Sequence, residues 1–184
     1  MGAPQLEPRR PGGGARGIRA FGSRRVALMV GFGVASALPN SLADSTLGAW
    51  MATLQVDIKT IGYFSLVVLP YNIKFLWAPF IDRYRLPFLG RRRGWMLMLL
   101  LAAAACVFLL GSSDPRGNPG VTVVLAFGLA FLGASFDIAN DAYKTDVLRP
   151  EERAAGNAAY TTGWRIALLI TGSVALVLAE WLPW

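Results

Sequence analysis

The sequence predicts an all-α integral membrane protein with about five transmembrane helices. Of its 184 residues, 54% are hydrophobic and only 16% are charged, and the mean hydropathy is +0.45. These values are more apolar than is usual for a soluble domain. Apolar runs also recur at about the 20-residue length that crosses about 30 Å of hydrocarbon. The expected spans are residues 26–42, 60–81, 95–111, 121–143 and 154–181.

The positions of the basic residues predict the orientation. Six arginines lie in the N-terminal tail, five follow the second span, and three basic residues follow the fourth span. Only Lys59 and Arg116 fall in the connections expected on the other side. Short segments rich in Lys and Arg stay in the cytoplasm, so we expect a multi-pass membrane protein with a cytoplasmic N-terminus.

Composition also excludes several functions. The net charge is +7, but the basic residues flank apolar spans instead of forming a face interleaved with aromatics, so no nucleic-acid partner is expected. Without histidine there is no Ser/His/Asp triad, and no phosphate-binding loop of the Gly-x-x-x-x-Gly-Lys-Ser/Thr type is present. The single Cys106 lies in an apolar run and predicts packing, with no disulfide. We therefore expect no enzyme, no cofactor and no metal site.

The N-terminal region permits two interpretations. Residues 1–22 are rich in Gly, Pro and Arg and predict a disordered cytoplasmic tail, which leaves residues 23–184 as the transmembrane domain. Ser23-Arg24-Arg25, an apolar run and Ala35-Ser36-Ala37 also fit a twin-arginine signal peptide with a cleavage site. Four further apolar spans favour a retained first helix instead.

The first and second spans contain helix-breaking prolines and polar residues. Pro39 is expected to kink the outer part of the first span, where Asn40 and Asp44 add polarity. The second span contains Pro70 and Lys74, and Lys74 lies eight residues, about 12 Å, before Asp82. Polar and broken segments at membrane depth face protein or a water-filled cavity.

The last three spans differ in character. Residues 95–111 are mainly Leu and Ala and predict a scaffold helix. In the fourth span Asp137 and Asp141 are four residues apart, so both carboxylates share one helix face. The run Arg149–Arg153 predicts a helix start because its acids fall in the first turn. Arg165 lies about 17 Å into the fifth span, near the membrane midplane.

These intramembrane charges form the candidate site. Each costs at least about 2.5–3.5 kcal/mol to insert, and such groups usually pair or line a pathway. They could simply neutralise one another, or they could form a polar cavity for an anionic solute with proton coupling. The candidate residues are Asn40, Tyr71, Asn72, Lys74, Asp137, Asp141, Trp164 and Arg165.

Depth along the helices suggests a pairing. Lys74 lies eight residues before Asp82 and Asp137 nine before Asp146, so the two should lie at similar depth. We therefore expect Lys74 to pair with Asp137, or with Asp141 one turn below. Arg165 would then be freer for an anionic substrate, and Asp137 would be the better candidate for proton coupling.

The connection between the second and third spans resembles a known signature. Residues 78–93 are similar to the Gly-x-x-x-Asp-Arg-x-Gly-Arg-Arg loop of the major facilitator superfamily, although Ala78 replaces its glycine and residues 85–89 are an insertion. The resemblance implies a gating role for Asp82, Arg83, Gly90, Arg91 and Arg92. A cluster of charges that only fixes topology is the alternative interpretation.

A more specific resemblance runs from about Gly33 to the end of the chain. The sequence is similar to AmpG-type muropeptide permeases in the segments 46–51, 59–66, 74–79, 82–84, 87–95, 137–138, 141–148, 150–153 and 163–165. Asn40 and Asp44 depart from the residues usual in that family. The family has twelve or more spans in two halves, so five spans predict a fragment that lacks the C-terminal half.

The resemblance implies a secondary transporter of the bacterial inner membrane. It would import N-acetylglucosamine–anhydro-N-acetylmuramyl peptides with protons for cell-wall recycling, an import that feeds β-lactamase induction in some bacteria. The implied partners are an anionic sugar-peptide substrate, protons and membrane lipids. The alternatives are a relative that carries another bulky anion, such as acetyl-CoA, and a non-transporting membrane assembly protein.

Overall fold

A computed structural model describes residues 22–53, 65–84, 90, 92–115 and 117–181, and within these residues every regular element is a helix. The elements in chain order are α2 (Arg24–Ser41), η1 (Leu42–Thr46), α3 (Leu47–Thr53), η2 (Ser65–Val68), α5 (Leu69–Ile73), η3 (Lys74–Leu76), α6 (Ala78–Arg83), α7 (Arg93–Gly111), α8 (Pro119–Val147) and α9 (Arg153–Trp181). The proposed tail, residues 1–21, lies outside the described residues.

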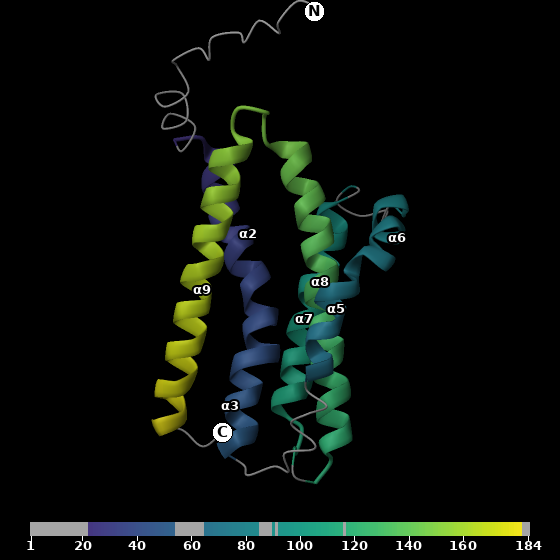
Figure 1. Cartoon of the computed structure of the whole chain (residues 1–184), viewed down its shortest axis with the longest axis vertical. Coiled ribbons are helices and arrows are strands. Elements are labelled where there is room, and N and C mark those ends of the chain that lie inside the picture. Colours follow the sequence, from purple (N-terminus) through teal and green to yellow (C-terminus); the bar gives the residue numbers. More distant parts are fainter. Residues whose placement is uncertain (1–21, 54–64, 85–89, 91, 116, 182–184) are drawn as a thin grey trace, which may run out of the picture.

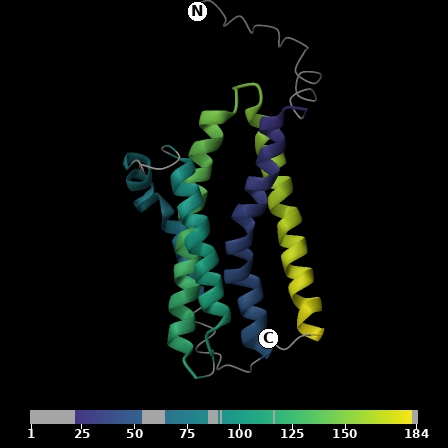
Figure 2. The same ribbon diagram turned by 180° about the vertical axis from the view of Figure 1, so that it is seen from behind.

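The helices form an elongated bundle of two groups (Figure 1). Helices α2 and α9 run side by side, while α7, α8 and α5 form the second group, and the view from behind shows the same arrangement (Figure 2). Contacts between α2 and α8 join the two groups. The start of α2 and the connection from α8 to α9 lie at one end of the bundle, and α3 and the turn from α7 to α8 lie at the other (Figure 1).

The first helix is longer than the sequence predicts. Instead of ending near Leu42, it continues through the π-helical turn η1 into α3. Pro39 has no N–H group and removes a helical hydrogen bond. Shortly after it, the Leu42 N–H is shared between the carbonyls of Leu38 and Pro39. The proline therefore disturbs the hydrogen-bond register without ending the helix, and a π-helical turn absorbs the change.

The second expected span is broken into short pieces. Residues 60–64 lie outside the described residues, and the remainder alternates between 3₁₀ and α-helix from η2 to α6. Pro70 and Pro79 each occupy the first turn of a short α-helix, α5 and α6. Proline favours that position because its missing N–H has no partner there in any case. The expectation of one continuous helix over residues 60–81 is wrong, because the two prolines start new short helices within it.

The third and fourth spans are confirmed as long helices. Among the described residues, two helices are long and apolar enough to cross a membrane, α7 and α8. The Cys106 thiol of α7 is buried and donates to the Leu125 carbonyl of α8 at 3.2 Å, as expected of a packing residue. Five transmembrane helices are not established by this criterion, although α9 forms a 29-residue helix at the fifth position.

Helix α9 starts within the predicted run, at Arg153, but the two acids precede the helix instead of falling in its first turn. The Glu152 carboxylate accepts a hydrogen bond from the Arg149 N–H at 3.2 Å, just before the helix begins at Arg153. A hydrogen bond from Ser23 and the one from Arg149 lower the pKa of the Glu152 carboxyl below its ordinary value. This carboxylate therefore ties the start of α2 to the start of α9.

Glycines bring α2 and α9 into close contact. A Cβ atom at Gly33 would lie 2.1 Å from the Tyr160 carbonyl oxygen, and one at Gly163 would lie 2.2 Å from the Val30 carbonyl oxygen. Both obstacles are backbone atoms, so a side chain at either position would force the helices apart. Small residues of this kind let helices pack closely in lipid.

We predict that Gly33→Ala and Gly163→Ala each lower the thermal unfolding midpoint of the chain in detergent. Overpacking costs about 1–3 kcal/mol, which corresponds to about 2–10 °C for a chain of this length. Gly31→Ala and Gly172→Ala are controls on the same helices, because a Cβ at either position meets nothing within 4 Å. These controls should keep or raise the midpoint, since alanine favours helix. Equal losses in all four variants would contradict the close-contact assignment.

Candidate functional site

The candidate site is centred on Asp137, inside the bundle between α2, α8 and the broken segment. One carboxylate oxygen, Oδ2, lies 3.6 Å from the Lys74 Nζ atom. The other, Oδ1, accepts a hydrogen bond from the Ser36 hydroxyl of α2. The side chain of Asp137 is 18% exposed and that of Lys74 34%. The pairing of Lys74 with Asp137, expected from their equal depth, is confirmed.

A second ion pair lies one turn along α8. The Lys144 Nζ atom is 2.7 Å from the Asp141 carboxylate, three residues earlier on the same helix. The alternative in which Lys74 pairs with Asp141 is therefore not formed. Lys144, one of the three basic residues that follow the fourth expected span, is thus a second cation of the cluster.

Tyr160 of α9 connects the two pairs. Its hydroxyl donates a hydrogen bond to Ser36 at 2.9 Å, and Ser36 in turn donates to Asp137. Its ring lies 3.7 Å from the Lys144 Nζ atom, a cation–π contact. Residues from α2, η3, α8 and α9 thus form one polar network. Sequence reasoning did not select Ser36 or Tyr160 because a single hydroxyl in an apolar span carries no distinctive pattern.

Two further polar groups near this network are buried. Asn140 is fully buried, and neither polar atom of its amide reaches hydrogen-bond geometry with a described group, although it lies close enough to interact with the Tyr160 hydroxyl. The hydroxyl of Tyr71 on α5 is also buried without such a partner. It lies beside Gly133, where a Cβ atom would be 2.3 Å from it. Buried polar groups without partners are rare enough to require an explanation.

The other predicted residues lie outside this network. Arg165 is exposed on α9 and forms no ion pair within the described part of the chain. The Asn72 side chain is exposed and donates to the Val68 carbonyl of its own segment at 3.4 Å. Asn40 and Trp164 are half-buried. Arg165 thus pairs with neither carboxylate of the cluster, in keeping with the expectation that it is freer, and the cation beside Asp141 is Lys144.

A second charged cluster lies at the end of the bundle where α6 and α7 meet. Arg92 contacts Asp82 at 2.7 Å and Asp146 at 2.6 Å, so one guanidinium joins α6, α7 and α8. Partial burial opposes its charge, but the hydrogen bonds to both carboxylates outweigh that effect and raise the pKa of Arg92. Sequence reasoning had not selected Asp146, although it lies in a segment matched to the family.

The remaining residues predicted for gating are placed differently. Arg83 is exposed, and Arg91 lies outside the described residues. Gly90 has φ +85°, a conformation that glycine adopts readily, and it precedes the turn into α7. Arg92 is thus the gating arginine that the structure brings to Asp82.

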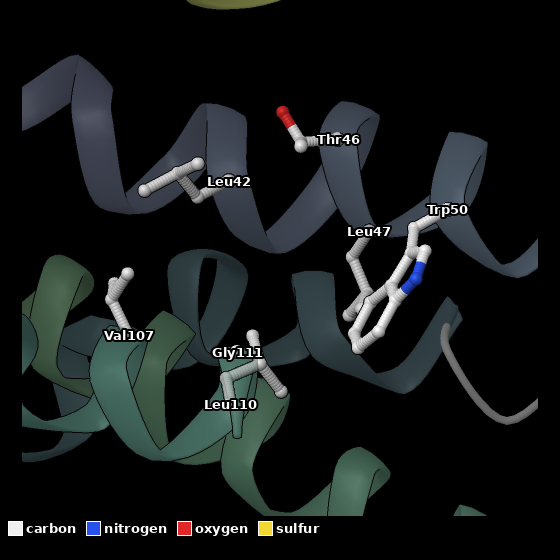
Figure 3. A pocket seen from close by; sticks show the side chains of 7 residues that line it. All are labelled: Leu42, Thr46, Leu47, Trp50, Val107, Leu110 and Gly111. Atoms are coloured by element: carbon white, nitrogen blue, oxygen red, sulfur yellow. The ribbon is translucent and has the colours of Figure 1, made fainter. Parts of the chain in front are cut away.

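A pocket between the first helix and α7 has a different character. It has a volume of about 190 Å³ and is lined by Leu42, Thr46, Leu47, Trp50, Val107, Leu110 and Gly111 (Figure 3). Thr46 and Trp50 carry the only polar side-chain atoms of this lining. An anionic solute would find no countercharge here, so this pocket is not the candidate site. No group of three His, Cys, Asp or Glu side chains within the described part could hold a metal ion.

Comparisons with known proteins extend this description. The anhydromuropeptide permease of Escherichia coli (strain K12) is 48% identical over 172 residues, which is 91% of this chain and 34% of that protein. A putative AmpG transporter of Rickettsia felis is 32% identical over 151 residues, 80% of this chain and 36% of that protein. The chain thus spans about a third of the length of these relatives. Residues 26–184 match the Major Facilitator Superfamily. This chain belongs to the Major Facilitator Superfamily of transporters, and it is not an enzyme.

Proposed function

We propose that this chain supplies the first helices of a proton-coupled importer of anhydromuropeptides in a bacterial inner membrane, with a cytoplasmic N-terminus. The observation that carries the proposal is the Lys74–Asp137 pair, a cation and a carboxylate held together inside the bundle. Similarity to the Escherichia coli anhydromuropeptide permease supports the choice of substrate.

Lys74 is the proposed contact for the anionic part of the substrate. It is one-third exposed and holds its carboxylate partner at 3.6 Å, which is longer than a tight charged hydrogen bond. An incoming carboxylate can therefore compete for the ammonium group. Arg165, exposed on α9, is proposed as a second cation, with Asn40, Tyr71, Asn72 and Trp164 as polar contacts along the path.

Asp137 is the proposed proton carrier. When a substrate anion takes Lys74, Asp137 loses its charged partner, and an unpaired buried carboxylate is strongly disfavoured. Uptake of a proton removes that penalty. Binding of the anion and binding of the proton thus favour each other, which is the requirement for symport.

The Arg92 cluster is the proposed gate. Its contacts with Asp82 and Asp146 hold the ends of α6, α7 and α8 together at one end of the bundle. A transporter must alternate between two arrangements of its helices. Contacts at the end of the bundle, far from Lys74, can change that equilibrium without contacting the substrate.

A chimera tests the proposed function. In it, this chain replaces the aligned N-terminal third of the Escherichia coli anhydromuropeptide permease, which it matches over 172 residues. We expect membrane vesicles that contain the chimera to accumulate labelled anhydromuropeptide when an inward proton gradient is imposed, and not without the gradient. The native permease is the positive control. Uptake of acetyl-CoA without muropeptide uptake, or uptake indifferent to the gradient, would refute the proposal.

We predict that Asp137→Asn in this chimera abolishes accumulation against a gradient, so that the final inside-to-outside ratio falls to about one. Substrate exchange should remain, because a neutral amide resembles the protonated acid. Asp114→Asn is the matched control, since Asp114 is exposed in the turn between α7 and α8 and lies outside the charged cluster. If Asp137→Asn accumulates substrate normally, the carboxylate is structural only.

We predict that Arg92→Gln slows uptake by the chimera more than Asp146→Asn does, because it breaks the contacts with both Asp82 and Asp146, whereas Asp146→Asn breaks only the second. Half-exposed ion pairs contribute about 1 kcal/mol or less each, so a rate change of up to about fivefold per pair is expected. The substrate concentration for half-maximal uptake should remain unchanged. Arg93→Gln is the control, since Arg93 stacks over the Tyr143 ring instead. A matching loss of substrate affinity would contradict a gating role.

A further inference from the structure

The hydrogen bonds around Asp137 have a direction that its charge determines. An ionised carboxylate can only accept, so the single proton of the Ser36 hydroxyl is committed to Asp137. Ser36 can then only accept from Tyr160, whose hydroxyl lies 2.9 Å away. The chain of donors therefore runs from Tyr160 through Ser36 to Asp137.

Asn140 takes no part in this chain of hydrogen bonds. It is fully buried next to Tyr160, one turn of α8 from Asp137, and both polar atoms of its amide lack a partner among the described residues. Leaving such a group unsatisfied costs about 1–3 kcal/mol. A buried amide of this kind is understandable if its partner arrives in another state of the site.

We propose that Tyr160 is a positioning residue of the coupling site whose hydroxyl donates to Ser36 when Asp137 is ionised and to Asn140 when Asp137 carries a proton. The proposal rests on the proposed role of Asp137 as proton carrier. It adds two residues to the coupling site, Tyr160 and Asn140. Neither forms a hydrogen bond with Asp137, but the charge of Asp137 decides which partner the Tyr160 hydroxyl has.

The change of partner of the Tyr160 hydroxyl follows from the hydrogen-bond donors that are present when Asp137 is protonated. A protonated Asp137 can donate to Ser36, which frees the Ser36 proton for the oxygen of Tyr160. The phenolic proton then needs an acceptor, and the neighbouring Asn140 amide, which has no partner among the described residues, can turn its carbonyl oxygen toward it. Only hydroxyl groups and the Asn140 amide rotate, and the sole added proton is the one on Asp137, so the number of protons balances.

The surroundings keep the rest of the site fixed during this change. The Lys144 ammonium group lies on the Tyr160 ring and pairs with Asp141, which holds the ring in position. The other ionisable groups that face Asp137 are Lys74 on η3 and Tyr71 on α5.

Thermal unfolding of the chain in phospholipid nanodiscs tests the proposal. With Asp137 present at neutral pH, Asn140→Leu should leave the midpoint unchanged or raise it, because it removes an unsatisfied amide. In an Asp137→Asn background, which mimics the neutral acid, the same substitution should lower the midpoint by about 2–4 °C. Adding Tyr160→Phe should abolish that loss, whereas Tyr143→Phe should not. An effect of Asn140→Leu that is equal in both backgrounds would overturn the proposal.

A second measurement uses the unsubstituted chain and does not depend on the folding of variants. The chain contains five tyrosines, so their ¹³Cζ signals can be resolved by solid-state NMR, with Tyr160 assigned through Tyr160→Phe. We expect the Tyr160 signal to move with the same pH midpoint as the carboxyl carbon of Asp137. If Asp137 titrates and Tyr160 does not respond, the switch is refuted while the proposed function stands. If Asp137 does not titrate, both are refuted.

Discussion

The burial of the Asp137 carboxylate is the constraint on which the arrangement of this bundle depends. A charge removed from water must be compensated by a countercharge and by hydrogen bonds. Here η3 supplies the countercharge through Lys74 and α2 supplies the hydrogen bond through Ser36. The three segments that meet at this carboxylate are distant in sequence. Satisfying one side chain therefore fixes their relative positions.

The irregular backbone of the second segment serves the same constraint. Lys74 is the first residue of η3, at a junction between α-helix and 3₁₀-helix that follows Pro70 by four residues. Nearby, the Trp77 indole donates to the Ser135 hydroxyl of α8 at 3.0 Å, and its ring packs against Phe131. These contacts hold the broken segment against α8, so that the Lys74 ammonium group lies within reach of Asp137.

Close helix contact and polar contact reinforce each other between α2 and α9. The glycines at 33 and 163 allow the backbones to approach, and that approach places the Tyr160 hydroxyl at hydrogen-bond distance from Ser36. Farther along the same pair, the hydroxyls of Ser41 and Thr171 lie 2.7 Å apart. The opposite group is built differently, since α7 exposes large apolar side chains such as Leu101 and Phe108. The polar network thus lies between the two groups, where α8 and η3 face α2 and α9, and α7 provides an apolar scaffold.

The sequence by itself determined the properties that depend on composition and on distance along a helix. Length and hydropathy located α7 and α8, and the equal depth of Lys74 and Asp137 predicted their pairing. The run at 149–153 located the start of α9, although its acids precede the first turn. Depth follows from the residue count because each helical residue rises by about 1.5 Å. The direction in which a side chain points toward another helix does not follow from that count.

Only the tertiary structure therefore decided that Lys144, and not Arg165, is the second cation of the cluster, that Arg92 joins Asp82 to Asp146, and that Ser36 and Tyr160 complete the network. It also decided that the helix continues past Pro39 as the π-helical turn η1, which contacts α8 and α9. In each case the partner lies on another element or depends on how the elements pack. The angles at which the helices pack cannot be read from a single sequence.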